Sequence, residues 1–161
     1  MGTLRPVVIT IILALIFGAG LCRAQSSKVN GLWNVEVTFG NGEARTFRFE
    51  AGESGKGSFR LMDPRSHSWG QAGPSDAKWT QSADGAVVFS GPVEFLIGNI
   101  GRDAGTLVLK SKLGTGVAIT GEAKFFPLPQ DPNDPAAQPS KSGSFNATRL
   151  TDAESSKSSA P

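Results

Sequence analysis

The chain has 161 residues with 20 glycines, 10 prolines and a single cysteine, which suits one domain with a single core and many turns. Its 16 basic residues exceed its 14 acidic ones, but Arg5 and Arg23 lie in a segment that we expect to be removed, so the remaining chain is neutral. A neutral chain gives no electrostatic reason to expect binding to nucleic acid or to an anionic membrane.

Residues 1–24 have the organisation of a secretory signal peptide. Arg5 supplies a positive charge, residues 7–21 are almost wholly apolar, and Cys22 and Ala24 are small residues at the positions that a signal peptidase reads. We predict cleavage before Gln25 and export to the periplasm or the extracellular space. The apolar run is shorter than the ~20 residues that cross a bilayer, so an uncleaved anchor is the weaker alternative, and no transmembrane segment follows.

Cys22 does not lie in a typical lipoprotein signal. Leu21 stands where a small residue should precede an acylated cysteine, and Ala19 replaces the usual leucine, so we do not expect a lipid anchor. Cleavage before Gln25 removes the only cysteine, and the mature chain can then form no disulfide. We expect residues 25–30 to be a short lead, residues 31–150 a single domain, and the Ser-rich residues 151–161 a disordered tail.

Alternating apolar side chains predict strands from residue 31 onward. The first strand, residues 31–39, ends at Gly40-Asn41-Gly42, a sequence typical of hairpin turns. The second, residues 44–50, places Phe47 and Phe49 inward, and we expect Arg45 in or near water. After a glycine-rich turn, Phe59 continues the core face. The side chains predicted to face the interior of the first three strands are Trp33, Val35, Val37, Phe39, Phe47, Phe49, Phe59 and Leu61.

The middle of the chain is less regular. Residues 62–74 interrupt the alternation, and a strand at residues 77–81 resumes it with Trp79. Val87 and Phe89 lead to Gly91-Pro92, where we expect a bend or a break in the strand. Residues 93–97 continue the alternation, and we expect a turn over residues 99–105 in which Asp103 is a turn residue.

Three further segments complete the chain. Strands are predicted over residues 106–113, 117–126 and 143–150, and the loop over residues 127–142, rich in Pro, Asp and Gln, is expected to be mobile. The inward side chains of these strands are Leu107, Leu109, Val117, Ile119, Ala123, Phe125, Phe145 and Ala147. About eight short strands joined mostly by short turns predict an all-β, antiparallel up-and-down β-barrel, which would leave no exposed sheet edge.

The two ends of this domain resemble the calycin barrels, which include the lipocalins. Gly31-Leu32-Trp33 opens the first strand after an export signal, and Gly143-Ser144-Phe145-Asn146-Ala147-Thr148-Arg149 closes the last. The resemblance implies that Trp33 packs across a closed end of the barrel with Arg149 over its ring. The closing sequence also looks like the end of many small exported bacterial barrels that lack assigned functions. The chain departs from the lipocalins in having no mature cysteine and no long helix after the strands.

The interior leaves two interpretations open. Phe47, Phe59, Trp79 and Phe95 could line a hollow calyx that holds a small hydrophobic or amphipathic molecule. Alternatively, the many rings fill the interior, because an eight-stranded barrel is barely wide enough for its own side chains. Inward polar residues are few.

The segment over residues 63–71 carries Arg65, His67 and Trp69 where we expect a loop at the barrel mouth. Such loops often recognise ligands, and these three residues are our candidate recognition set. Equally, Trp69 could fold back as a lid over the core, because an exposed tryptophan is unfavourable.

Catalytic and metal-binding patterns are missing from the sequence. His67 is the only histidine and has no nearby cysteine or obvious acid partner, no Gly-X-Ser-X-Gly motif occurs, and the mature chain has no cysteine for a zinc site. We therefore expect a monomeric, non-enzymatic barrel without cofactor or metal, binding a small apolar ligand. The alternative is a solid-cored module that binds another protein of the cell envelope.

Overall fold

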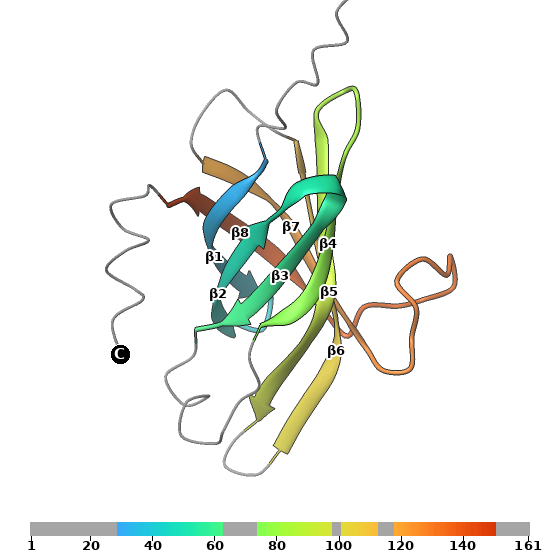
Figure 1. Ribbon diagram of the computed structural model, residues 1–161. Helices are drawn as coiled ribbons and strands as arrows, with labels where there is room; N and C mark the ends of the chain where they lie inside the picture. Colours follow the sequence, from blue (N-terminus) through green and yellow to red (C-terminus); the bar gives the residue numbers. More distant parts are fainter. Residues whose placement is uncertain (1–28, 63–73, 98–100, 113–117, 151–161) are drawn as a thin grey trace, which may run out of the picture.

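Eight antiparallel strands close into a barrel in simple chain order, with β8 pairing back to β1 (Figure 1). The computed structural model describes residues 29–62, 74–97, 101–112 and 118–150. The strands are β1 (Gly31–Phe39), β2 (Ala44–Ala51), β3 (Lys56–Leu61), β4 (Ser75–Gln81), β5 (Ala86–Ile97), β6 (Gly101–Lys112), β7 (Ala118–Pro127) and β8 (Lys141–Arg149). The predicted all-β, up-and-down antiparallel barrel of eight strands is confirmed.

Helical structure is confined to one short turn in the described residues. The 3₁₀ turn η1 (Glu53–Gly55) connects β2 to β3, and no helix there is long and apolar enough to cross a membrane. The alternation of side chains across each strand sets the register. In β1, for example, Trp33, Val35 and Val37 are buried, whereas Glu36 and Thr38 are exposed.

Closure depends on the pairing of the first and last strands. The ladder between β1 and β8 runs from Trp33 opposite Arg149 to Phe39 opposite Gly143. Val35 and Ala147 face each other within this ladder, and both are buried. The apolar faces of β1 and β8 therefore join the same core, which fixes the register of closure.

The bend or break expected at Gly91-Pro92 is wrong. β5 continues through both residues, and Gly91 and Pro92 pair with Leu107 and Thr106 of β6. The ladder between β4 and β5 ends at Ser90, so beyond this point β5 pairs with β6 alone. A proline is tolerated where a strand has only one hydrogen-bonded neighbour, which explains why Pro92 does not interrupt β5.

The turn expected over residues 99–105 is also wrong over its described part. β6 begins at Gly101, five residues before the predicted strand, and Asp103 lies opposite Phe95 in the β5–β6 ladder. Asp103 is therefore a strand residue rather than a turn residue. It shares the inward parity of Leu107 and Leu109, which places its side chain at the inner rim of the barrel.

The interior is crossed by aromatic rings in contact. The ring centroids of Phe39 and Phe95 are 5.9 Å apart, and those of Phe47 and Phe95 are 6.0 Å apart. Phe49 and Phe89 approach to 4.5 Å. In an eight-stranded barrel β5 lies opposite β1, so the contacts of Phe95 extend from one wall to the other.

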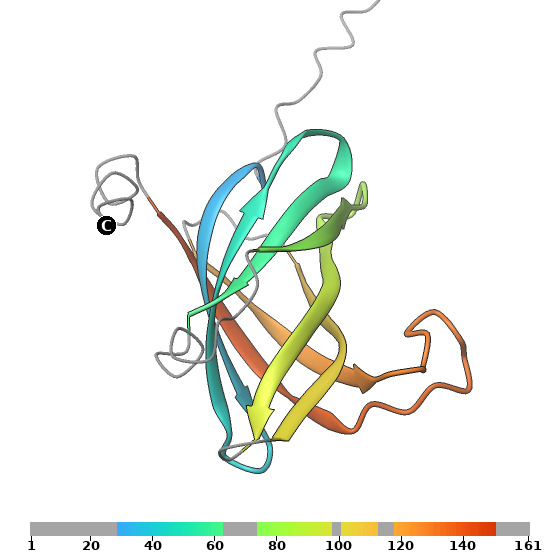
Figure 2. The ribbon, with the colours of Figure 1, turned by 60° about the horizontal axis from the view of Figure 1, so that its bottom comes forward.

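The barrel has two structurally different ends. We call the end formed by the start of β1 and the end of β8 the Trp33 end. The opposite end, where β5 and β6 extend past their neighbours, is the charged end, and the long β7–β8 connection leaves the barrel there (Figure 2).

Candidate functional site

At the Trp33 end, a tryptophan and an arginine lie in contact. Arg149 Cζ lies 4.8 Å from the centre of the Trp33 ring, and Trp33 Nε1 donates a 2.8 Å hydrogen bond to the carbonyl of Val29. Gly31 has φ of +128°, which a side chain would strain, and the Arg149 guanidinium occupies the space beside it. The contact that the resemblance implies between Trp33 and Arg149 is thus present.

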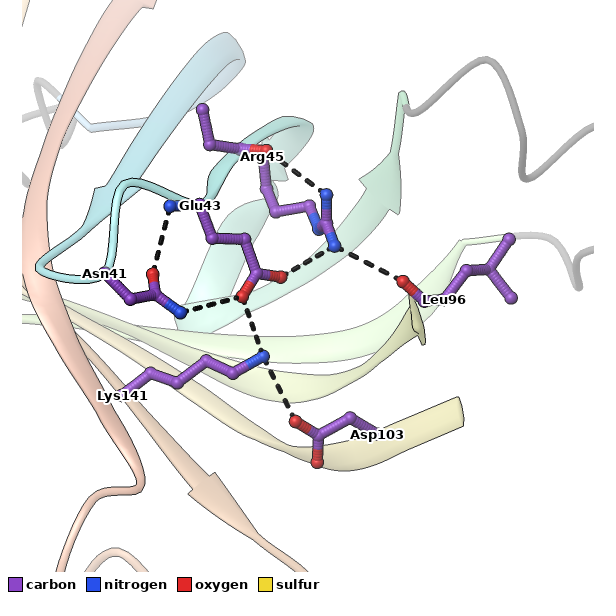
Figure 3. Close-up of polar contacts among 7 residues, drawn as sticks. Asn41, Glu43, Arg45, Leu96, Asp103 and Lys141 are labelled. Carbon is purple, nitrogen blue, oxygen red and sulfur yellow. Dashed lines mark hydrogen bonds and ion pairs between the residues drawn. The ribbon is translucent and has the colours of Figure 1, made fainter. Parts of the chain in front are cut away.

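At the charged end, four ionised side chains converge from different parts of the barrel (Figure 3). Glu43 comes from the β1–β2 hairpin, Arg45 from β2, Asp103 from β6 and Lys141 from the start of β8. We call these four residues the charged cluster. Arg45, Asp103 and Lys141 share the inward parity of their strands, so the sheet itself directs them toward the barrel axis.

Opposite charges alternate through the charged cluster. Arg45 Nη2 lies 2.6 Å from Glu43 Oε1, and Lys141 Nζ lies 3.0 Å from Glu43 Oε2 and 3.2 Å from Asp103 Oδ2. Arg45 also donates a 3.3 Å hydrogen bond to the carbonyl of Leu96 on β5 (Figure 3). The network therefore joins β2, β5, β6 and β8 across the mouth, and its formal charge is zero.

The cations of the cluster also lie on the aromatic core. Arg45 Cζ is 5.5 Å and Lys141 Nζ is 5.1 Å from the centre of the Phe95 ring, and Lys141 approaches the rings of Phe39 and Phe125 at 5.9 and 5.5 Å. The exposed fractions of the Arg45 and Lys141 side chains are only 11% and 16%. Each cation is thus paired with a carboxylate on one side and an aromatic face on the other, which offsets part of its desolvation cost.

Electrostatics hold Glu43 in its ionised form. Burial by itself would raise the pKa of Glu43, but the hydrogen bond from Lys141 and the charges of Arg45 and Lys141 outweigh it and lower the pKa below its ordinary value. Asn41 contributes in the same direction, and the Glu43 amide returns a 3.0 Å hydrogen bond to Asn41 Oδ1. A carboxylate stabilised in this way is a weak base and a poor proton donor near neutral pH.

The residues predicted from the sequence to form a site fall into three groups. Arg65, His67 and Trp69 lie outside the described residues. Phe47, Phe59 and Phe95 are buried and in ring contact, since Phe47 lies 6.0 Å from both Phe59 and Phe95. Trp79 is buried elsewhere, where its Nε1 donates hydrogen bonds to the carbonyls of Gly52 and Lys56 at 2.9 and 3.1 Å. Trp79 thus packs on the η1 turn at the Trp33 end.

Sequence reasoning missed the charged cluster. Arg45 was expected in or near water, yet it follows the parity of Phe47 and Phe49 and lies mostly buried at the rim. Asp103 and Lys141 were not counted as inward residues, because the strands that carry them were predicted to begin at residues 106 and 143. The parity of each strand carried the signal. For Asp103 and Lys141 the predicted strand ends were wrong, whereas Arg45 lies within the predicted strand over residues 44–50 and shares the parity of Phe47 and Phe49.

Among the described residues, no group of three or more His, Cys, Asp or Glu side chains is placed to hold a metal ion. Comparisons of the chain with protein-family models, with curated proteins and with solved structures found no match.

Proposed function

We propose that this protein is an exported, non-enzymatic β-barrel with a packed interior that binds another protein of the cell envelope through its outer surface. The observation that carries the proposal is the set of ring contacts across the barrel, centred on Phe95, whose exposed fraction is 0%. A barrel filled in this way leaves its outer faces and loops for recognition. The export part of the proposal rests on the sequence pattern of residues 1–24.

Glycines on the inner face support a filled core. A Cβ added at Gly91 would lie 2.7 Å from Ala77 Cβ and 3.0 Å from a ring carbon of Phe59. A Cβ added at Gly105 would collide with the carbonyl oxygen of Phe126 on the neighbouring strand β7 and would lie 2.6 Å from the Phe125 ring. Neighbouring side chains and strand backbone thus occupy the space that a larger residue would need at these two positions, as is expected of close packing.

The pairing of charges at the mouth supports the same proposal. All four residues of the charged cluster neutralise one another, and the cluster covers the rings of Phe39, Phe95 and Phe125. A small amphipathic molecule would have to separate these ion pairs and then displace buried rings. The depressed pKa of Glu43 further favours a structural role over proton transfer.

Native mass spectrometry of the mature protein, purified gently from its own envelope after mild cross-linking, tests the proposal. We expect the bare barrel and a stoichiometric complex with a second protein, with no small molecule released on unfolding. A panel of fatty acids and small aromatics should leave the melting temperature of the purified barrel unchanged. A copurifying small molecule that raises the melting temperature when added back would instead establish a ligand-binding calyx.

A further inference from the structure

The β7–β8 loop (residues 128–140) projects from the barrel, and hydrogen bonds fix its base. It begins where the Leu128 amide donates a 3.1 Å hydrogen bond to the Ala104 carbonyl, and it ends where the Ser140 amide donates a 2.9 Å hydrogen bond to the Phe125 carbonyl. The Gln138 amide donates to Gln130 Oε1 at 3.1 Å, which joins the two sides of the loop near its base. Beyond this base the loop projects clear of the barrel wall (Figure 2).

Two consecutive turns give the β7–β8 loop its shape. Asp131 Oδ1 accepts hydrogen bonds from the backbone and side chain of Asn133 at 2.9 Å, and Asp134 Oδ1 accepts from the Ala136 amide at 2.8 Å. The amides of Asp134 and Ala137 close the turns with 3.0 Å bonds to the carbonyls of Asp131 and Asp134. Four prolines fix further backbone angles: Pro129, Pro132, Pro135 and Pro139. The segment expected from its composition to be mobile thus carries its own hydrogen-bonded turns.

Such preorganisation reduces the entropy that a loop loses when it binds a partner. Compact projecting loops whose ends lie close together are frequently functional, and long connections in a small domain usually require such a reason. The other described connections, at residues 40–43, 52–55 and 82–85, are short turns. The β7–β8 loop is therefore the described connection best suited to recognition.

The surface chemistry of the loop indicates its partner. Leu128 has an exposed fraction of 67%, and the other large apolar residue exposed among the described residues is Ile97, at 52%, on the same end of the barrel. Asp131 and Asp134 are exposed, and no basic residue occurs over residues 128–140. Lys141, which follows directly, is turned inward to Glu43 and Asp103 and does not neutralise the loop.

The carboxylates of Asp131 and Asp134 have acceptor sites that could accept hydrogen bonds from a partner. Oδ1 of Asp131 and of Asp134 holds a turn, whereas Oδ2 of each accepts no hydrogen bond from the described part of the chain. An ionised carboxylate has about four acceptor sites on its two oxygens. Two negative charges and no positive charge disfavour an anionic lipid surface or a nucleic acid, and favour a surface that carries Lys or Arg.

We propose that the β7–β8 loop is the arm by which the barrel binds its protein partner: Leu128 enters an apolar depression on the partner, and Lys or Arg side chains at the rim of that depression pair with Asp131 and Asp134. This inference rests on the proposed function as an interaction module and names the surface and the chemistry of the partner.

Site-specific photo-cross-linking of the full chain in its own cell tests the arm. The photoreactive residue is placed at Ala136 in the loop and, as a matched control, at the exposed Glu36 on β1. We expect one protein adduct from position 136 and none from position 36. The adduct partner is then purified, and its affinity for the barrel is measured at 50 mM and 300 mM salt.

Two variants separate charge from loop shape. Asp131→Asn with Asp134→Asn keeps an oxygen that can accept the turn hydrogen bonds but removes both charges, so we expect a loss of affinity of about fivefold or more and a weaker salt dependence. Leu128→Ser should lower affinity at both salt concentrations. Melting curves like that of the wild type establish that both variants are folded.

The outcomes distinguish the two proposals. Adducts from position 36 but not 136, or an affinity that the Asn variant leaves unchanged, would overturn the arm while an interaction module remains. A bound small molecule with no protein adduct from either position would overturn both. Binding to phosphatidylglycerol vesicles that depends on the loop would also overturn the arm, since its charge predicts no such binding.

Discussion

Removing the ring of Phe95 is the sharpest test of the packed interior. Its exposed fraction is 0%, and its centroid lies within 6.0 Å of the rings of Phe39, Phe47 and Phe125. Truncating a buried Phe to Ala costs about 3–5 kcal/mol, and the loss of the aromatic face beneath Arg45 and Lys141 adds about 0.5–1 kcal/mol each. We therefore expect Phe95→Ala to lower the free energy of unfolding by about 4–7 kcal/mol.

Equilibrium denaturation in urea measures this change. A loss of this size is comparable to the whole stability of many domains, so Phe95→Leu, with an expected loss of roughly 1.5–3 kcal/mol, keeps the measurement within range. Leu128→Ala is the matched control, because the exposed Leu128 should cost less than about 0.5 kcal/mol. If Phe95→Ala cost under about 1.5 kcal/mol at an unchanged slope, the ring would not be in a packed core and the reasoning would be refuted.

Three further changes probe the ends and the wall of the barrel. Arg149→Ala should cost about 1–3 kcal/mol in a urea melt, because it uncovers the buried face of Trp33; a change within the error of the melt would exclude the stabilising role. Glu43→Gln should destabilise the barrel at pH 7 and weaken the dependence of its free energy of unfolding on pH in the acid range. The lowered folded-state pKa of Glu43 gives stability that is present above the ordinary value of 4.5 and is lost as the pH falls through the folded-state pKa, so parallel wild-type and variant profiles from pH 6 to 3 would contradict the ion network. Gly91→Ala should cost about 1–3 kcal/mol by thermal melt, since the new Cβ would meet Ala77; an unchanged melting temperature would indicate free space inside the wall.

Strand positions were predictable because apolar side chains occupy every second position along the strands. Phe47 and Phe49 on β2, and Phe145 and Ala147 on β8, were assigned to the core from parity alone, and all four are buried. Parity is a local property, since neighbouring side chains of a strand always point to opposite faces. The hairpin at Gly40-Asn41-Gly42 was also recognisable, because its residues suit the backbone of a tight turn; Gly42 has φ of +82°.

Strand ends were not predictable from local signals. Gly91-Pro92 looked like a break, yet the two residues continue β5 because β6 pairs along their whole length. Asp103 looked like a turn residue, yet its strand partner is Phe95. In both cases pairing with a neighbouring strand outweighed the preference of the residues themselves, which is the usual way that tertiary context overrides propensity in sheets.

The sequence by itself determined the strand pattern, the inward rings and hence an antiparallel barrel, because side-chain alternation and turn residues act over only a few positions. Only the tertiary structure decided that the rings meet across the barrel and that Glu43, Arg45, Asp103 and Lys141 converge at one end. Apart from the neighbouring Glu43 and Arg45, these residues are distant in the chain, and the distances between them depend on closure between β1 and β8 and on the register of every ladder between those strands. The distances between these side chains therefore depend on all the ladders of the sheet together, and no single segment of the chain determines them.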